Sequence, residues 1–230
     1  MKYAEKTIGS IVAENYQAAA VFDKYRLDFC CGGKKLLGEA CSQRQINVEE
    51  VEADLRQLTQ SADPAKAFQQ MDSGTLISYI LLQHHFYIRQ YGPIILQHLE
   101  KVAHKHGGNF PYMIRVAAVF SALLEELLQH MRKEEEVLFP AIRSLDLPGS
   151  NSNVHIQAPI RVMEQEHDEA GFLLEEIRTL TNNYTIPEQA CTTFRISLME
   201  LEEFEARMHE HVHLENNILF PKALHMMIPA

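Results

Sequence analysis

Apolar residues recur at every third or fourth position through most of the chain, a spacing typical of amphipathic helices. No convincing run alternates apolar and polar residues as a half-buried strand would. The pattern therefore predicts an all-α protein, and its longest periodic segments predict a four-helix bundle with short connecting loops. We expect the four helices near residues 75–102, 111–145, 156–181 and 187–226.

Glycine, proline and asparagine mark the breaks between these helices, at 107–111, 147–151 and 182–187. Gly92-Pro93 lies inside the first predicted helix. Proline removes a backbone hydrogen bond, so we expect this pair to kink or interrupt the helix.

The first 60 residues carry shorter patterns. An amphipathic segment at 8–24 is followed by a short helix at 34–43. Asn47 is a predicted N-cap for a helix ending near Leu58. We expect a small helical module at 1–60, a linker at 61–74 and the bundle at 75–230. Two adjacent cysteines, Cys30 and Cys31, precede two glycines in the module.

The composition narrows the class of protein. The chain has 230 residues, 46% of them hydrophobic, and a formal net charge of −10, which argues against nucleic acid or an anionic membrane as the main partner. No signal-peptide pattern and no uninterrupted run of about 18 apolar residues occurs. We therefore expect a soluble cytoplasmic protein. Four cysteines do not form a disulfide framework, so free thiols in a reducing compartment are the simpler interpretation.

A repeat carries the candidate chemistry. Residues 130–140 and 211–221 both read H-x-x-x-E-x-x-[VI]-L-F-P, at an offset of 81 positions. If the second and fourth helices are copies, the first and third should be copies as well. His85 and His167, 82 positions apart, fit that expectation.

Residues four apart share one face of a helix, so His130 with Glu134, and His211 with Glu215, can bind the same metal pair. The first motif continues an apolar stripe that runs on to Val137. Buried carboxylates without a counter-charge cost several kcal/mol, and a cation offsets that cost. The nitrogen and oxygen donors favour two iron ions, with manganese as second choice. We expect Glu134 and Glu215 to bridge the ions, together with an oxo or hydroxo group.

Several alternatives remain open. A salt-bridged polar layer would also place these residues in a bundle core, and His84 competes with His85 as a ligand. Glu126 and Glu166 can stand behind the ligands, line an access channel, or be ordinary surface residues. The pair at 135–136 is expected to be an exposed charge run, since asparagines replace it in the second copy. The remaining histidines are expected to be solvated, namely His98, His104, His106, His155, His209, His213 and His225.

These residues resemble the hemerythrin-like di-iron bundles, and more closely the repair of iron centres family of the YtfE/ScdA/DnrN type. The motifs that carry this likeness are DFCCGG at 28–33, EQEHDEAG at 164–171, ACTT at 190–193 and LENNILFP at 214–221. The resemblance covers essentially the whole chain. It implies a protein that restores iron–sulfur clusters damaged by nitric oxide or peroxide. It also implies iron ligands at His85, His130, Glu134, His167, His211 and Glu215.

The mechanism is less defined by the sequence. The first hypothesis is a repair factor that donates iron to damaged iron–sulfur proteins or removes nitric oxide from them, rather than a classical enzyme. The alternatives are a nitric oxide reductase acting at the diferrous site, and an O2 or redox sensor. Cys30 and Cys31 can accept nitric oxide, transfer iron, bridge two chains, or simply be small buried residues. Cys191 is expected to be structural, and we expect a homodimer.

Overall fold

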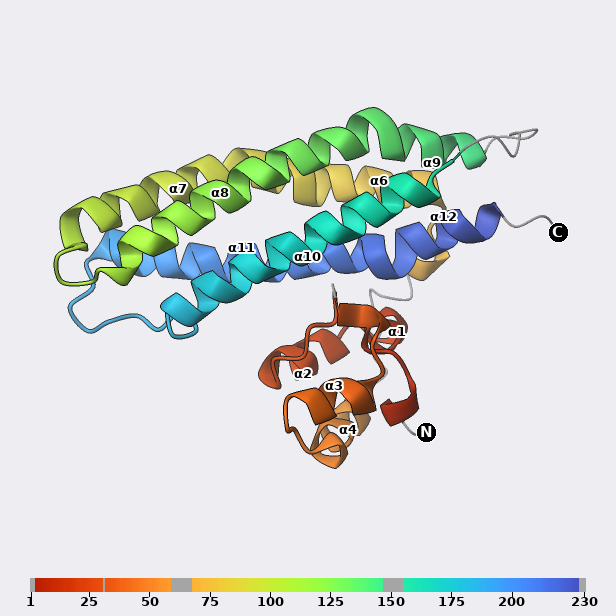
Figure 1. Ribbon diagram of the computed structural model, residues 1–230, viewed down its shortest axis with the longest axis horizontal. Coiled ribbons are helices and arrows are strands. Elements are labelled where there is room, and N and C mark those ends of the chain that lie inside the picture. Colours follow the sequence, from red (N-terminus) through yellow and green to blue (C-terminus); the bar gives the residue numbers. More distant parts are fainter. Residues whose placement is uncertain (1–2, 31, 59–67, 147–154, 228–230) are drawn as a thin grey trace. The chain divides into compact units, whose positions relative to one another are not determined.

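The computed structural model describes residues 3–30, 32–58, 68–146 and 155–227 (Figure 1). The chain divides into two compact units. The first takes its described residues from Met1–Ile77, Leu145–Asn153 and His209–Ala230, and the second from Ser78–Ser144 and Val154–Met208. Cys31 and the first half of the predicted linker, 61–67, lie outside the described residues. Among the described residues, no helix is both long and apolar enough to cross a membrane.

Short helices build the N-terminal part of the first unit. They are η1 (Tyr3–Glu5), α1 (Ile8–Glu14), α2 (Ala18–Lys24), η2 (Gly32–Lys34), α3 (Leu37–Gln43) and α4 (Val48–Gln57). The Thr7 side chain caps α1, and the Asn47 side chain caps α4 as predicted, accepting from the backbone N–H of Glu49 at 3.0 Å. The single segment predicted at 8–24 is wrong, because the chain turns at Asn15, whose side chain accepts from the Gln17 N–H.

The first unit also contains the C-terminal end of the chain, where η5 (Glu215–Leu219) leads into α12 (Phe220–Met226). Two glycines, Gly9 of α1 and Gly33 of η2, lie against Asn217 of η5. A Cβ on Gly9 would lie 2.1 Å from Asn217 Oδ1, and one on Gly33 would lie 2.7 Å from the same atom. Only glycine leaves room for the asparagine there.

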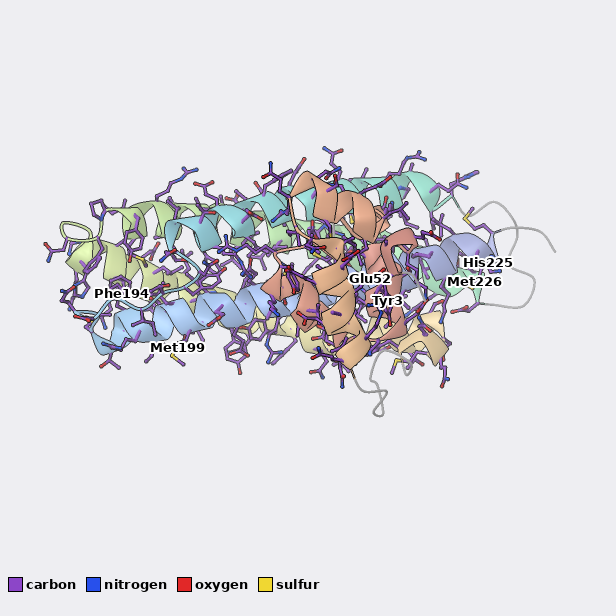
Figure 2. All side chains as sticks on the ribbon, turned by 90° about the horizontal axis from the view of Figure 1, so that it is seen from below. Tyr3, Glu52, Phe194, Met199, His225 and Met226 are labelled. Atoms are coloured by element: carbon purple, nitrogen blue, oxygen red, sulfur yellow. The ribbon has the colours of Figure 1, made fainter. Side chains whose placement is uncertain are left out.

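The second unit contains most of the long helices expected for the bundle. Its long helices are α7 (Phe86–His106), α8 (Tyr112–Lys133), α10 (Gln157–Leu180) and α11 (Thr192–Leu214, up to Met208 within this unit), and they run alongside one another in Figure 1. Helix α7 packs along α8, and α8 along α10. The Phe204 ring of α11 contacts Tyr87 of α7 and Phe120 of α8, with ring centroids 6.1 and 5.0 Å apart. Along α11, Phe194 is buried whereas Met199 faces outward (Figure 2).

Two predicted boundaries of the long helices differ from the structure. Helix α7 is not interrupted at Gly92-Pro93, because it continues from Phe86 to His106 with Pro93 inside it. Gly92 serves packing instead, since a Cβ there would lie 2.5 Å from a methyl carbon of Leu124 on α8. The fourth helix begins at Thr192 rather than at residue 187, after a turn.

In the part of the chain that the structure describes, three π-helical turns interrupt the long helices, and the sequence pattern did not predict them. They are η3 (Leu81–His85) between α6 (Ser73–Ile80) and α7, η4 (Glu134–Leu138) between α8 and α9 (Phe139–Leu145), and η5. In each, a phenylalanine N–H bonds to the carbonyl five residues back, as Phe139 does to Glu134. The wider turn breaks the apolar stripe, so Val137 is 58% exposed and Leu138 is buried in its place.

Candidate metal centre

The two copies of the repeat end in the same local structure. In each, the histidine lies in the last turn of a long helix, and the glutamate opens the π-helical turn that follows. The regular α-helical hydrogen bonding is therefore interrupted in each copy at the glutamate, whose polar side chain faces the core. π-Helical turns of this kind are frequent at functional sites. The six predicted ligands are all at most 3% exposed, at His85, His130, Glu134, His167, His211 and Glu215.

Glu134 lies between two imidazoles in the second unit. Its Oε2 is 3.3 Å from Nε2 of His85, and its Oε1 is 3.3 Å from Nε2 of His130. The Nε2 atoms of His130 and His167 are 3.0 Å apart. Three imidazole nitrogens and one carboxylate therefore point at the same small volume. This arrangement supplies donors for cations, and the ring of His85 stacks on Phe139 with centroids 5.7 Å apart.

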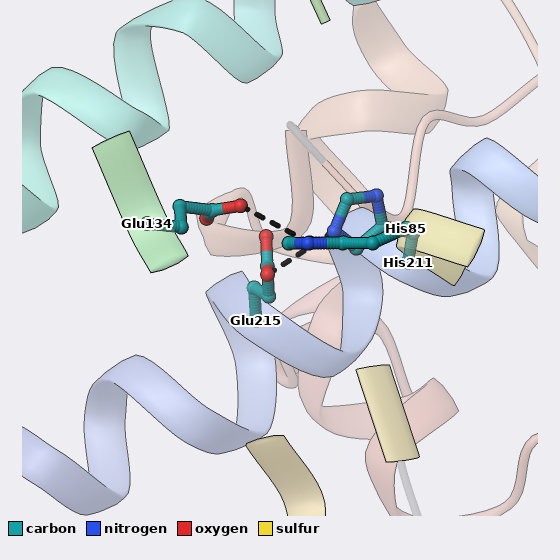
Figure 3. A group of neighbouring side chains, drawn as sticks. All are labelled: His85, Glu134, His211 and Glu215. Atoms are coloured by element: carbon teal, nitrogen blue, oxygen red, sulfur yellow. Dashed lines mark ion pairs between the residues drawn. The ribbon is translucent and has the colours of Figure 1, made fainter. Parts of the chain in front are cut away.

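His211 and Glu215 form the corresponding pair of the second copy, with Nε2 and Oε1 3.1 Å apart. Among the described residues, two groups of buried side chains can hold a metal ion, and within each group the donor atoms lie within 4.8 Å of one another. One group is His85, Glu134, His211 and Glu215, drawn in Figure 3 with its ion pairs dashed. The other is His130, Glu134, His167 and Glu215. Both carboxylates therefore belong to both groups.

The neighbouring histidine His84 is also buried, but it belongs to neither group. Its ring meets the edge of Tyr79 at a centroid distance of 5.9 Å. The geometry therefore favours His85 over His84 as the ligand.

Two carboxylates lie behind two of the histidines, Glu135 behind His85 and Glu166 behind His130. The position of Glu135 differs from the prediction. Glu135 is not part of an exposed charge run: its Oε1 lies 2.7 Å from Nδ1 of His85, and Arg89 bonds both of its oxygens. Partial burial alone would raise the pKa of Glu135, but hydrogen bonds from Arg89 and His85 outweigh it and lower that pKa. Glu136 is exposed, as predicted.

Glu166 has the same relation to His130. Its Oε2 lies 2.9 Å from Nδ1 of His130, and its other oxygen accepts from Lys133. The hydrogen bond from His130, helped by Lys133, lowers the pKa of Glu166 to about 2 although burial opposes the shift. Glu166 therefore lies behind a ligand, and it also lines the cavity beside that ligand, so it combines two of the roles left open by the sequence.

A cavity of about 180 Å³ opens beside this group in the second unit. His130 and His167 form part of its wall, and Glu126, Lys133 and Glu166 form part of its rim. Glu126 is exposed, so it lies on the access side of the cavity rather than against a ligand. A cavity of this size admits a diatomic molecule or water.

One histidine expected to be solvated is buried. His213 is 1% exposed, and its ring lies near Phe29 and Tyr16 at centroid distances of 6.0 Å. Its Nδ1 is 3.2 Å from the Asn217 amide nitrogen, and its Nε2 has no hydrogen-bond partner among the described residues. Burial lowers the pKa of His213 to about 4. The helical pattern did not reveal this, because the apolar residues that cover His213 come from the N-terminal module.

The other histidines follow the prediction in part. His104, His155 and His225 are exposed. Two are half-buried beside carboxylates, since His98 Nδ1 is 2.8 Å from Glu200 and His209 lies near Asp23.

The cysteines also differ from expectation. Cys191 was predicted to be structural, but it is exposed, and its Sγ lies 3.3 Å from Nε2 of the half-buried His106. Cys30 is buried and donates to Asp28 from both its backbone N–H and its thiol.

Asparagines of η5 hold the loop that contains Cys30. The Asn216 amide donates to the Cys30 carbonyl at 3.5 Å, and the Asn217 amide donates to the Phe29 carbonyl at 3.3 Å. These asparagines occupy the repeat positions of Glu135 and Glu136. In the second copy of the motif, these two positions therefore hold the cysteine loop. In the first copy, the glutamates at the same positions contact His85 and Arg132 instead.

Two known domain families match the two parts of the sequence. Residues 76–223 match the hemerythrin HHE cation binding domain, and residues 4–59 match ScdA_N, a domain of unknown function (DUF542). The iron–sulfur cluster repair protein YtfE of Yersinia pseudotuberculosis serotype IB is 40% identical over 97% of this chain and 99% of its own. The YtfE of Yersinia pestis strain Pestoides F is 39% identical over the same shares. The chain belongs to the YtfE family of hemerythrin-domain proteins. The hemerythrin domain implies bound iron, and the histidine–glutamate groups of this YtfE family member can hold a metal ion.

Proposed function

We propose that the chain binds two iron ions, one in each of the two groups of buried side chains. The observation that carries this proposal is that Glu134 and Glu215 belong to both groups. A carboxylate has two oxygens, so one glutamate can bind two ions at once. The ligands would be His85 and His211 for one ion, His130 and His167 for the other, and the two glutamates as bridges.

The donor set fits iron. Two carboxylates at 0% exposure among imidazoles are costly without a cation, by several kcal/mol each. Neutral imidazole and carboxylate suit iron, with manganese as second choice, whereas the absence of thiolate disfavours Cu(I). The bound iron supplies redox chemistry and affinity for small ligands. The protein's own residues orient the imidazoles and admit small molecules through the cavity.

We further propose that the protein repairs iron–sulfur clusters damaged by nitrosative or oxidative stress, with damaged iron–sulfur proteins as its targets. Family membership and the printed names of the relatives support this role. Carboxylate bridges suit a site that must give up iron, because a glutamate that shifts or is protonated loosens the ion. Donation of iron is therefore our first mechanism, and removal of nitric oxide the second.

Metal analysis tests the site. We expect about two irons per chain after anaerobic reconstitution of the wild type, and a clear loss in His130→Ala. The matched control is His98→Ala, which removes a half-buried histidine bonded to Glu200 on the same bundle. Less than one iron per chain in the wild type and in His130→Ala alike would refute the site.

Iron transfer tests the function. The iron-loaded protein is incubated with an apo iron–sulfur protein, cysteine and a sulfide source, and cluster formation is followed by visible absorption. We expect faster cluster formation than with an equal amount of free iron held by a weak chelator. If loaded wild type and His130→Ala perform alike, iron donation is wrong.

The cavity beside His130 and His167 gives one reason to test a second chemistry, because it offers nitric oxide or O2 a route to the site. N2O released from the reduced protein in a single turnover would identify nitric oxide reduction. Stable, reversible spectral change with O2 and no cluster repair would identify a sensor.

The remaining sequence-based statements stay predictions. They are the division into a module at 1–60, a linker at 61–74 and a bundle at 75–230, a cytoplasmic location and a homodimer. Light scattering of the purified protein measures the oligomeric state directly.

A further inference from the structure

A continuous series of polar contacts runs through the second unit, with Glu134 at its middle. From one surface it runs through Arg89, Glu135 and His85 to Glu134. From Glu134 it continues through His130 and Glu166 to Lys133, whose side chain is half exposed. The order of groups is the same in both directions: carboxylate, imidazole, carboxylate, cation.

Each imidazole in this series uses its two nitrogens differently. Nε2 faces Glu134 at 3.3 Å in both cases, whereas Nδ1 faces Glu135 at 2.7 Å or Glu166 at 2.9 Å. A carboxylate that accepts a hydrogen bond from Nδ1–H fixes the tautomer with its lone pair on Nε2, and it also fixes the rotation of the ring. The Nε2 lone pair is then directed at the inner carboxylate, where a cation must sit.

Both outer carboxylates are held charged and in place. Arg89 bonds Glu135 through two nitrogens, at 2.8 and 2.9 Å, and Lys133 bonds Glu166. Such charge-assisted bonds restrict the carboxylate more than a single neutral hydrogen bond does.

The two supports are not copies of each other. The repeat position of Glu135 in the second copy is Asn216, which donates to the Cys30 carbonyl. Counting 82 positions back from Glu166 leads to His84, which is not a carboxylate. Glu135 and Glu166 therefore occupy positions that are not equivalent in the repeat. The two histidines that they contact belong to different metal groups.

We propose that Glu135 and Glu166 are positioning residues, each serving one of the two iron ions: Glu135 through His85, and Glu166 through His130. This inference rests on the proposed di-iron site and adds to it. It assigns one outer carboxylate to each ion, so the ions can be weakened separately.

The test measures iron affinity and stoichiometry in Glu135→Ala and Glu166→Ala, by titration with a competing chelator and by ⁵⁷Fe Mössbauer spectroscopy. Removing a partner behind a metal ligand typically weakens metal binding by about 10- to 100-fold. We expect each variant to lose one iron at a chelator concentration at which the wild type keeps both. The subspectrum that disappears should differ between the two variants.

Two further sets of variants separate positioning from folding. Glu135→Gln and Glu166→Gln retain an oxygen that can accept from Nδ1–H, so we expect them to restore part of the affinity. The control variant is Glu136→Ala, which removes a neighbouring exposed glutamate that accepts a hydrogen bond from Arg132. We expect this variant to bind both ions as the wild type does. In the metal-free wild type, ¹⁵N spectra of the imidazoles should show Nδ1–H at His85 and His130, lost in the matching Ala variant.

The outcomes distinguish the two levels of the argument. If the wild type does not hold two irons, the proposed site fails. If the wild type holds two and each Ala variant also keeps both with unchanged affinity, or loses both together, the assignment of one carboxylate to each ion is overturned.

Discussion

Buried His213 should make the stability of the metal-free protein fall as the pH is lowered. The fold keeps this imidazole neutral, because burial against Phe29 and Tyr16 lowers its pKa to about 4 from an ordinary value of 6.5. In the unfolded chain the same imidazole is protonated below about pH 6.5. Protons then favour the unfolded state.

The sign and the window follow from those two values. The stability that depends on the neutral imidazole is fully present above pH 6.5, is lost as the pH falls from 6.5 toward 4, and changes no further below 4. At about 1.36 kcal/mol per pKa unit, the complete loss is about 3 kcal/mol. Between pH 7 and pH 5 it amounts to about 2 kcal/mol.

Urea unfolding of the metal-free protein at pH 7 and pH 5 measures this loss, because it gives the free energy of unfolding at each pH. Other groups titrate over the same range, so the relevant quantity is the difference between variants. His213→Gln replaces the imidazole with a neutral group and should lose about 2 kcal/mol less than the wild type on going from pH 7 to pH 5. The control is His225→Gln, which alters an exposed histidine of the same C-terminal segment.

The reasoning is refuted if the wild type and His213→Gln lose the same free energy of unfolding between pH 7 and pH 5. A lower stability of His213→Gln at both pH values would not matter, since only the change with pH is compared. His225→Gln should follow the wild-type curve.

Three shorter predictions concern packing, charge and thiol access. Gly9→Ala should lower the free energy of unfolding by about 1–3 kcal/mol, because the new Cβ overlaps the Asn217 side chain; a double variant with Asn217→Ala should recover part of this loss in urea unfolding, and no recovery would contradict the contact. Arg178→Ala should cost about 3 kcal/mol or more, because it leaves the carboxylate of Glu205, 3% exposed, without its bidentate partner; thermal unfolding unchanged from the wild type would count against it. Cys191 should react with iodoacetamide before the other described cysteines, which are buried, and peptide mass spectrometry of a time course would show whether any of them reacts earlier.

Much of the bundle and of the buried histidine–glutamate cluster could be predicted because both rest on local spacing. His130 and Glu134 are four residues apart on one helix, and that distance brings their side chains together in any helical fold. The duplication then located the equivalent pair and pointed to His85 and His167. None of these inferences needed knowledge of how distant segments meet.

The features that the sequence did not predict depend on contacts between segments far apart in the chain. Glu135 was expected to be exposed because its repeat position holds an asparagine, and only the approach of Arg89 and His85 gives it a role. His213 has an ordinary sequence environment and is buried by residues about 190 positions away. A periodicity of three to four residues carries no information about either contact.

The π-helical turns bear on which single-residue deletions the chain can absorb. A wide turn holds one residue more than a regular turn needs, so removing one residue from it can restore the usual i to i+4 ladder while the helices on either side keep their faces. The same deletion in the middle of α8 would rotate every later residue of that helix by about 100°. Val137, turned outward from η4, is the natural residue to remove. A chain lacking Val137 should still fold, but Glu134 would then lie on a tighter turn. We therefore expect this deletion to preserve helix formation and to reduce iron retention.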